Sequence, residues 1–509
     1  MTIEEDRSAP RRLVLGVIAA GIVARLVLAG LSGLGVDESY AAAVARPFSL
    51  SYFDHPPMVF WLVGATEALV GQHAWALRLP LILLFAGTTW LLFRLGSRLY
   101  GEWAGAYGAV ALNLAPFFSL SAGSWIVPDG PLLFFLVAGA YCLSRALDDP
   151  GDRLTWWIAA GVAGGCAGLS KYVAVFTAAG AFGFLATSNA RRWLTRPGPW
   201  IATGVALLVA SPVVIWNASH GWASFRFQGA HTGVSSVAGF HPEALLTSVA
   251  GQALYLLPWI WLALLWVLVA GFRAGPATKD WLLSWLAVGP ILTLALLALG
   301  GHPGLPHWAA GGYEFLFPLL GAWIARQRVR FRRVELIGSA AVLFLLLAVF
   351  GAQAATGAVS EAFPAAFRVD PTLELVDWSP VRPLFERLGI GSARAFAAAP
   401  DWIAAGKLGY ALGPSVPVLC LGPAPHHFAY RFDAAAFQGK DALLIERADQ
   451  NARGLFAQAF HDVDSVATLT IYRGARPAFA LTVFVGRGFT PNTVSPEAGS
   501  PRPSPDPLP

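Results

Sequence analysis

Charged residues are scarce in this sequence of 509 residues: they form 13% of the chain, while hydrophobic residues form 56%. A soluble globular protein carries about 25% charged residues, so this balance excludes a cytosolic globular enzyme and a disordered scaffold. Cysteine is also rare. The three cysteines are too few for the disulfide framework of a small secreted domain: Cys142, Cys166 and Cys420.

Long apolar runs are what the sequence has in abundance. A helix crosses the bilayer hydrocarbon with about 20 predominantly apolar residues. Residues 57–71 are apolar but few, and they include Glu67, so we expect this stretch to form an interfacial segment in the outer leaflet. Eleven other windows predict a polytopic α-helical membrane protein with about eleven transmembrane helices: 13–33, 77–96, 103–122, 131–147, 155–170, 172–188, 200–216, 245–270, 281–300, 307–325 and 334–353.

Lys and Arg residues are unevenly distributed between the loops that join these windows. Cytoplasmic loops hold an excess of them. With a cytoplasmic N-terminus, the inner segments hold seventeen such residues and the outer loops of the membrane region hold four. If residues 57–71 also crossed the membrane, every later loop would lie on the opposite side, and the distribution of Lys and Arg would no longer agree with the rule. The net charge of +5 therefore reflects membrane topology, and we expect no nucleic-acid partner.

The composition changes after the eleventh window. Residues 1–12 are expected to be cytoplasmic, and residues 13–355 to form the membrane domain with an outer loop at 34–76. Residues 360–489 alternate short β-type runs with Pro and Gly breaks, which predicts a small α/β domain on the outer face. Residues 490–509 are rich in Pro and Ser, which is typical of a disordered tail. The strand-like runs are 416–421, 442–446, 466–472 and 478–485, and 449–460 is helix-like.

Ionisable side chains gather at the outer ends of the windows and in the outer loops. Such groups are costly near a membrane and deserve a functional hypothesis. Because they arrive from several connections, we expect one cleft open to the outside. The ten residues are Asp37, Glu38, Asp54, His55, Asp129, Lys171, His231, His241, His302 and His307.

Each candidate also has a purely structural interpretation. Asp37 and Glu38 could cap a short helix at 39–45, or Asp37 could act as a general base towards an acceptor hydroxyl. The segment 52–57 (YFDHPP) could be an interfacial turn, or it could present Tyr52 and His55 to a phosphate.

The remaining candidates also allow both a structural and a functional interpretation. Asp129 precedes Gly-Pro and could cap a helix. Lys171 could extend to lipid headgroups or bind an anionic ligand. Arg25, inside the first window, could pair with a buried acid or contact the ligand. Three further residues could be interfacial anchors or could line a sugar pocket: His302, His307 and Trp308.

Three motifs in the first 80 residues carry a family resemblance: 35–40 (GVDESY), 52–57 (YFDHPP) and 76–80 (ALRLP). With them, residues 10–355 resemble the membrane glycosyltransferases of the protein O-mannosyltransferase/aminoarabinose-transferase superfamily, which have the GT-C fold. Three later segments fall where further family motifs are expected: 128–132 (PDGPL), 168–171 (GLSK) and 306–308 (PHW).

The resemblance implies transfer of a sugar, with inversion, from a polyprenyl-phosphate carrier to an acceptor on the outer side. Asp37 matches the acid treated as catalytic, and Asp129 matches a second acid near the donor site. Tyr52 and His55 match donor-phosphate contacts. Many relatives carry Lys at the position of His55, and a neutral imidazole would bind phosphate less strongly, so Lys171 would supply the missing charge.

The predicted function is therefore an inner-membrane glycosyltransferase that acts on a lipid A, glycan or protein acceptor of the envelope. We expect no cofactor and leave a divalent metal open. A transporter or lipid flippase, and an oligosaccharide ligase or polymerase, remain the alternatives. The predicted site comprises the catalytic group Asp37, Glu38 and Asp129; the phosphate group Tyr52, His55, Lys171 and Arg25; and the sugar or acceptor pocket Tyr40, Asp54, His302, His307 and Trp308.

Overall fold

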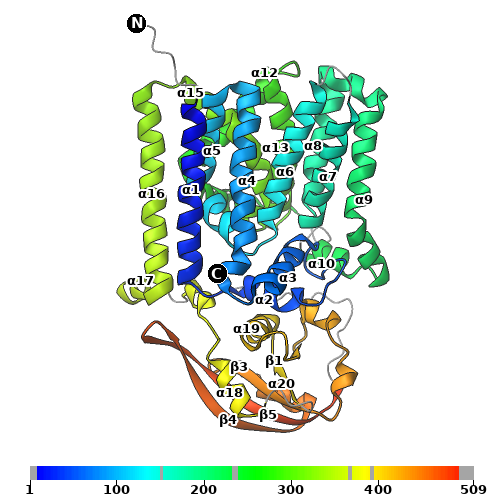
Figure 1. Cartoon of the computed structure of the whole chain (residues 1–509), viewed down its shortest axis with the longest axis vertical. Coiled ribbons are helices and arrows are strands. Elements are labelled where there is room, and N and C mark those ends of the chain that lie inside the picture. The colour runs from blue at the N-terminus through cyan, green and yellow to red at the C-terminus, as the bar shows by residue number, and fades with distance from the viewer. Residues whose placement is uncertain (1–7, 149–152, 232–238, 365–369, 390–394, 492–509) are drawn as a thin grey trace. The chain divides into compact units, whose positions relative to one another are not determined.

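The computed structural model describes residues 8–148, 153–231, 239–364, 370–389 and 395–491 (Figure 1). The chain divides into two compact units. Unit 1 comprises Met1–Leu26, His55–Met58 and Leu79–Leu345, and unit 2 comprises Val27–Asp54, Val59–Arg78 and Leu346–Pro509. Most of the predicted Pro-rich tail, residues 492–509, lies outside the described residues, as do residues 1–7 of the predicted cytoplasmic N-terminus.

Unit 1 is helical throughout its regular elements. Three of the helices that build it run on into unit 2: α1 (Ala9–Leu31), α4 (Ala74–Tyr100) and α16 (Val329–Thr356). The others are α5 (Glu102–Leu114), α6 (Asp129–Leu147), α7 (Leu154–Ser170), α8 (Ala174–Thr187), α9 (Pro197–Ser219), α10 (Ala223–His231), α11 (Pro242–Leu256), α12 (Pro258–Ala274), α13 (Lys279–Leu299), α14 (Ala310–Tyr313) and α15 (Phe317–Arg326).

Every predicted window coincides with helical structure. Six described helices are long and apolar enough to cross a membrane by themselves: α1, α4, α6, α9, α13 and α16. The window 245–270 is not one continuous helix, because α11 and α12 meet at an angle of 108°. Leu257 has a φ of 68°, and Pro258, which has no N–H, begins α12. The protein is therefore a multi-pass membrane protein, and the number of eleven crossings stays a prediction.

Small residues bring neighbouring helices of unit 1 close together. A Cβ atom at Gly165 of α7 would lie 2.6 Å from Cβ of Val209 in α9, and one at Gly180 of α8 would lie 2.1 Å from the carbonyl oxygen of Trp285 in α13. These distances leave no room for a side chain. Glycine at both positions therefore permits the close packing that membrane helices use in place of a hydrophobic driving force.

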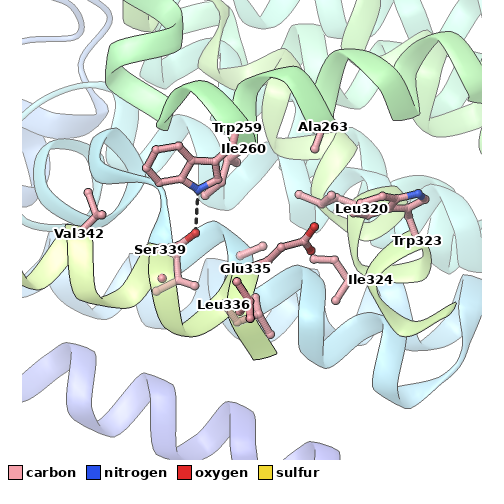
Figure 2. Close-up of a pocket in the computed structure, with 14 residues that line it drawn as sticks. Trp259, Ile260, Ala263, Leu320, Trp323, Ile324, Glu335, Leu336, Ser339 and Val342 are labelled. Atoms are coloured by element: carbon pink, nitrogen blue, oxygen red, sulfur yellow. Dashed lines mark hydrogen bonds between the residues drawn. The ribbon is translucent and has the colours of Figure 1, made fainter. Parts of the chain in front are cut away.

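Unit 1 also contains a cavity of about 410 Å³ between α5, α12, α15 and α16. Its lining is mainly apolar, and Trp259 Nε1 donates a hydrogen bond to Ser339 Oγ at 2.9 Å. Figure 2 shows the carboxylate of Glu335 among the apolar side chains of this cavity. None of the predicted site residues lines it, so the cavity does not correspond to the predicted site.

Unit 2 combines two short helices from the first 80 residues with a C-terminal sheet. The helices are α2 (Val36–Ala45) and α3 (Met58–Val70), the latter from Val59 onwards. The sheet has the order β2-β1-β3-β5-β4, with β1 parallel to β2 and β3 and the remaining pairs antiparallel. Its strands are β1 (Ala395–Ala399), β2 (Val418–Cys420), β3 (Asp441–Arg447), β4 (Phe460–Arg473) and β5 (Arg476–Phe489).

The helices of the C-terminal region are α17 (Ala358–Ala362), α18 (Val381–Arg387), α19 (Trp402–Leu412) and α20 (Arg453–Ala459). Helix α19 packs against α2, and the backbones approach so closely that a Cβ at Gly406 would lie 2.8 Å from Cα of Tyr40. The four predicted strand runs are confirmed. The predicted helix 449–460 is partly wrong, because α20 begins at Arg453 and Phe460 already belongs to β4.

Candidate active site

The start of α2 is fixed by a buried ion pair. Arg78 and Glu38 are 1% and 3% exposed. Arg78 Nε donates to Glu38 Oε1 at 2.7 Å, and Arg78 Nη2 donates to Oε2. The N–H of Gly35 also donates to Glu38 Oε2 at 2.8 Å. Both oxygens of Glu38 are therefore engaged, which leaves Asp37, in contact with solvent beside them, as the carboxylate available for chemistry.

Lys407 supports the same segment from α19. Its side chain is buried, with 4% of the residue exposed, and Nζ donates to the carbonyl oxygens of Leu34, Glu374 and Val376. Burial lowers the pKa of Lys407 to about 8, although the negative charges of Glu38 and other acids oppose the shift. A cation held by backbone oxygens thus fixes the residues that precede α2.

The surroundings of Asp37 favour its neutral form. Desolvation by surrounding protein is the largest effect, and the negative charges of Glu374, Glu38 and Asp54 add to it, while His426 opposes them; together they raise the pKa of Asp37 to about 6. The residue is nevertheless exposed to solvent, so its carboxyl group can exchange a proton with water. A carboxyl group whose pKa lies near the working pH is well suited to accept a proton as a general base.

Asp54 lies in a second buried cluster of unit 2. It is 6% exposed, Tyr40 Oη donates to its Oδ2, and Nδ1 of His426 contacts its Oδ1. The N–H of His427 donates to Tyr40 Oη at 2.9 Å. Nδ1 of His427 accepts a hydrogen bond from the N–H of Phe53 at 3.2 Å. Two adjacent histidines therefore bind the segment 52–57 at two points.

Tyr52 is fully buried in the same cluster. Its ring stacks on Phe60 with centroids 4.1 Å apart and lies 4.6 Å from the ring of His427. Burial raises the pKa of Tyr52 to about 12, so the phenol stays protonated at physiological pH and can act as a hydrogen-bond donor.

Unit 1 brings together a second group of predicted residues. Lys171, at the end of α7, donates to both oxygens of Asp129, the first residue of α6, at 3.0 and 2.9 Å. The side chains are 13% and 6% exposed. His307 and His55 are near enough to interact electrostatically with Asp129, and the ring of His307 stacks on Phe117 at 5.6 Å. The predicted convergence of both groups in one cleft stays a prediction.

Arg25 is held by neutral acceptors in the interior of unit 1. Arg25 Nε donates to the carbonyl oxygen of Ser119 at 2.9 Å, and Nη2 donates to Ser119 Oγ at 3.1 Å and to Asn113 Oδ1 at 3.4 Å. Its guanidinium also lies 4.5 Å from the centroid of the Phe85 ring. These contacts fix α1 beside the π-helical turn η1 (Phe117–Ala122).

The other predicted residues are placed at the edges of unit 1. The backbone N–H of His302 donates to the carbonyl oxygen of Leu297 at 3.0 Å, just after α13. The Trp308 ring packs beside Gly304, and His241 Nδ1 lies 2.9 Å from Glu243 Oε1. The side chain of His231 lies outside the described residues. Across the ranges that the structure describes, no group of three His, Cys, Asp or Glu residues could hold a metal ion.

Sequence reasoning missed Lys407, Glu374, His426 and His427. Adjacent histidines are a visible signal in a chain with ten histidines, but nothing in the sequence near them points to Asp54, 372 positions away. Lys407 lies in the short apolar helix α19. Its neighbours in the sequence give no sign that its Nζ donates a hydrogen bond to the carbonyl oxygen of Leu34.

Comparison with known proteins now defines the class. Residues 54–216 match the family described as dolichyl-phosphate-mannose-protein mannosyltransferase. The lipid A galacturonosyltransferase RgtD of Rhizobium johnstonii is 28% identical over 325 residues, which cover 62% of this chain and 67% of that protein. An undecaprenyl phosphate-alpha-4-amino-4-deoxy-L-arabinose arabinosyl transferase of Proteus mirabilis is 26% identical over 104 residues, 20% of this chain and 19% of that one.

The fold comparison extends over nearly the whole chain. The crystal structure of ArnT from Cupriavidus metallidurans bound to undecaprenyl phosphate is similar with a TM-score of 0.65 and 16% identity, covering 92% of this chain and 97% of that one. The protein therefore has the GT-C fold. The comparisons together show a membrane glycosyltransferase with this fold, which confirms the predicted resemblance.

Proposed function

We propose that this protein transfers a sugar from a polyprenyl-phosphate carrier to an acceptor in the cell envelope, on the outer face of the inner membrane. The undecaprenyl phosphate bound to ArnT and the lipid A modification named for RgtD support the classes of donor and acceptor. The observation that carries the proposal is the exposed carboxyl group of Asp37, which lies in the first turn of α2 beside the buried pair of Glu38 and Arg78; its pKa, raised to about 6, fits the same role.

Asp37 is the general base of the proposed reaction. It accepts the proton of the acceptor hydroxyl while the acceptor oxygen forms a bond to the anomeric carbon. The bond from that carbon to the phosphate oxygen breaks on the opposite face, so the configuration inverts and polyprenyl phosphate leaves. Glu38 contributes through its pair with Arg78, which fixes the direction of the loop before Asp37.

Lys171 and His55 form the proposed phosphate site, for which Tyr52 and Arg25 are the further candidates from the sequence. Negative charge grows on the phosphate as the bond to the sugar breaks, and a preorganised cation lowers the energy of that transition state. Asp129 holds Lys171 in place through both carboxylate oxygens. The proposed sugar and acceptor contacts are Tyr40, Asp54, His302, His307 and Trp308.

The proposed topology completes the assignment. Eleven crossings with a cytoplasmic N-terminus place residues 360–489 outside the inner membrane, and membrane lipids surround residues 13–355. The excess of Lys and Arg in the inner loops supports this orientation. A single cysteine introduced near His55 should react with an impermeant reagent from outside in intact cells. Labelling that requires permeabilised cells would contradict the orientation.

Replacement of Asp37 tests the proposed chemistry. Purified Asp37→Asn protein, assayed with polyprenyl-phosphate sugars and envelope glycolipids, should lose about 10²–10⁴-fold in transfer, the usual contribution of a general base. Asp148→Asn is the matched control, because that side chain is 64% exposed. Wild-type transfer by Asp37→Asn would remove the base assignment, and absence of transfer by the wild type with every lipid-linked sugar would overturn the function.

The acceptor can be identified in cells. Mass spectra of envelope glycolipids and glycoproteins from cells with and without the gene should differ by the mass of one sugar. A difference equal to a whole glycan would instead favour an oligosaccharide ligase or polymerase, and no difference would contradict the proposed transfer.

A further inference from the structure

We propose that the cavity beside α16 in unit 1 binds a zwitterionic aminophospholipid of the phosphatidylethanolamine type. In this proposal an acyl chain fills the cavity, and Arg332 and Glu335 of α16 bind the headgroup. The inference goes beyond sugar transfer and does not depend on it, because no residue assigned to the transfer lines this cavity.

Helix α16 is packed loosely against the rest of unit 1. Of its most apolar stretch of 18 residues, 11% are buried inside the protein, against 56% for the corresponding stretches of α4 and α6. The cavity of about 410 Å³ lies between α16 and the helices α5, α12 and α15. Empty space of this size is rare in protein interiors. Beside a helix that is long and apolar enough to cross a bilayer, the molecules available to fill the cavity are lipids.

The walls of the cavity suit a hydrocarbon chain. Leu320 and Ile324 of α15 contribute apolar side chains. On α16, a Cβ atom at Gly338 would meet no atom within 4 Å, so the backbone there borders open space. The indole N–H of Trp259 donates to Ser339 Oγ at 2.9 Å, so that donor is satisfied within the wall and requires no polar group of a ligand.

Glu335 is the charged residue of this lining. Figure 2 shows its carboxylate pointing toward α15, where Leu320 and Ile324 are apolar. Within the described ranges, the Glu335 side chain has no hydrogen bond or ion pair with the protein. An acid at the membrane is costly unless a cation or hydrogen-bond donors accompany it. A ligand with a cationic donor would therefore supply what the surrounding helices do not.

Arg332 places a positive charge next to this carboxylate. It lies one turn before Glu335 on α16, and residues three apart on a helix share one face, with Cβ atoms about 5–6 Å apart. Its guanidinium carbon lies 4.8 Å from the centroid of the Tyr107 ring in α5. Tyr107 in turn precedes by one turn Ala111, which lines the cavity. The cation therefore lies at the end of the cavity where α16 begins.

This pair of charges is complementary to one kind of headgroup. The phosphate of phosphatidylethanolamine carries a negative charge that Arg332 can bind with two parallel N–H donors. Its ammonium group, a few bonds further on, carries a positive charge and three N–H donors for Glu335. Side chains tilt toward the N-terminus of their helix, so the carboxylate lies closer to the level of Arg332 than its own Cα does. Phosphatidylcholine has the same charges but no N–H donor, so Glu335 selects the amine.

The proposal can be tested by native mass spectrometry of the full-length protein in detergent with added lipids of identical acyl chains. The wild type should bind phosphatidylethanolamine about tenfold more tightly than phosphatidylcholine, the size expected for one charge-assisted hydrogen bond. Glu335→Leu should bring this ratio close to one. Glu102→Leu is the matched control: it removes an exposed acid in the first turn of α5, outside the cavity lining, and should keep the preference.

A second variant tests whether the acyl chain occupies the cavity. Gly338→Leu places a side chain in the open space and leaves both charges in place, so it should weaken binding of both lipids and keep their ratio. Leucine is a better helix former than glycine, and a Cβ at this position meets no atom within 4 Å, so the variant should fold. Circular dichroism checks this.

The lipids themselves separate the alternatives. Equal binding of the two zwitterionic lipids by the wild type, or a preference that persists in Glu335→Leu, would overturn the proposal. Stronger binding of phosphatidylglycerol would show that arginines alone select the lipid, and stronger binding of undecaprenyl phosphate would show that the cavity takes a polyprenyl lipid; either result would also overturn it. None of these results alters the assay of sugar transfer with Asp37→Asn.

Discussion

Removal of Arg78 should destabilise the protein far more than removal of an ordinary surface arginine. Arg78 is 1% exposed and makes six hydrogen bonds, to Glu38, Gly33, Ala29 and Ser32. Arg78→Ala would leave the carboxylate of Glu38 buried without its cation. Breaking a buried pair in this way costs about 3–5 kcal/mol. The loss in free energy of unfolding for Arg78→Lys should be intermediate, because an ammonium group has three N–H donors and lacks the planar fork of a guanidinium group.

Arg98→Ala is the matched control on the same helix. Arg98 Nη2 contacts Asp148 Oδ2 at 3.0 Å, but the two side chains are 26% and 64% exposed, and exposed pairs contribute only about 0.2–1 kcal/mol. The free energy of unfolding can be measured in mixed micelles by titration with a denaturing detergent, followed by circular dichroism. Equal losses for Arg78→Ala and Arg98→Ala would refute the reasoning, because they would show that the buried pair does not fix the start of α2.

Three further predictions address the charges of the site. Lys171→Met should weaken donor binding and lower kcat/KM for transfer, whereas donor affinity equal to wild type in a binding assay would exclude Lys171 from the phosphate site. In the wild type, kcat/KM should fall about tenfold per pH unit below about pH 6 as Asp37 (pKa about 6) becomes protonated; a profile flat down to pH 5 would contradict this. Burial lowers the pKa of Lys407 from 10.5 to about 8, so between these values the unfolded state binds more protons. The difference in free energy of unfolding between the wild type and Lys407→Met should therefore increase as the pH rises from 8 to 10.5. A difference that does not change with pH would be inconsistent with the lowered pKa of Lys407.

The sequence predicted those features whose signals are local. A short helix after Asp37 follows from the acids that precede an alanine-rich run, and α2 confirms it. The apolar windows predicted the helices of unit 1 because about 20 apolar residues are needed to cross the bilayer. The bend between α11 and α12 was missed, since Pro258 can either interrupt a helix or begin one, and hydropathy alone does not separate these cases.

Features that depend on distant partners could not be predicted. Strand β1 has the sequence AFAAA, and alanine favours helices; the segment becomes a strand because β2 and β3 pair with it on both sides. The pairing of Asp54 with His426 joins residues 372 positions apart. Only the folded chain reveals that Lys407 donates a hydrogen bond to the carbonyl oxygen of Leu34.

These distant contacts change how the C-terminal region is understood. Sequence composition suggested that residues 360–489 form a separate domain, yet in unit 2 they fold together with residues 27–54 and 59–78. Arg46 Nη1 donates to the carbonyl oxygen of Gly409 at 2.7 Å, and Gly406 lies against Tyr40. Removal of the first 80 residues would expose the buried face of α19 and deprive Lys407 of an acceptor. We therefore expect residues 360–489 expressed alone to be aggregated or only partly folded. A monomeric fragment with cooperative thermal unfolding would show instead that the region is an independent domain.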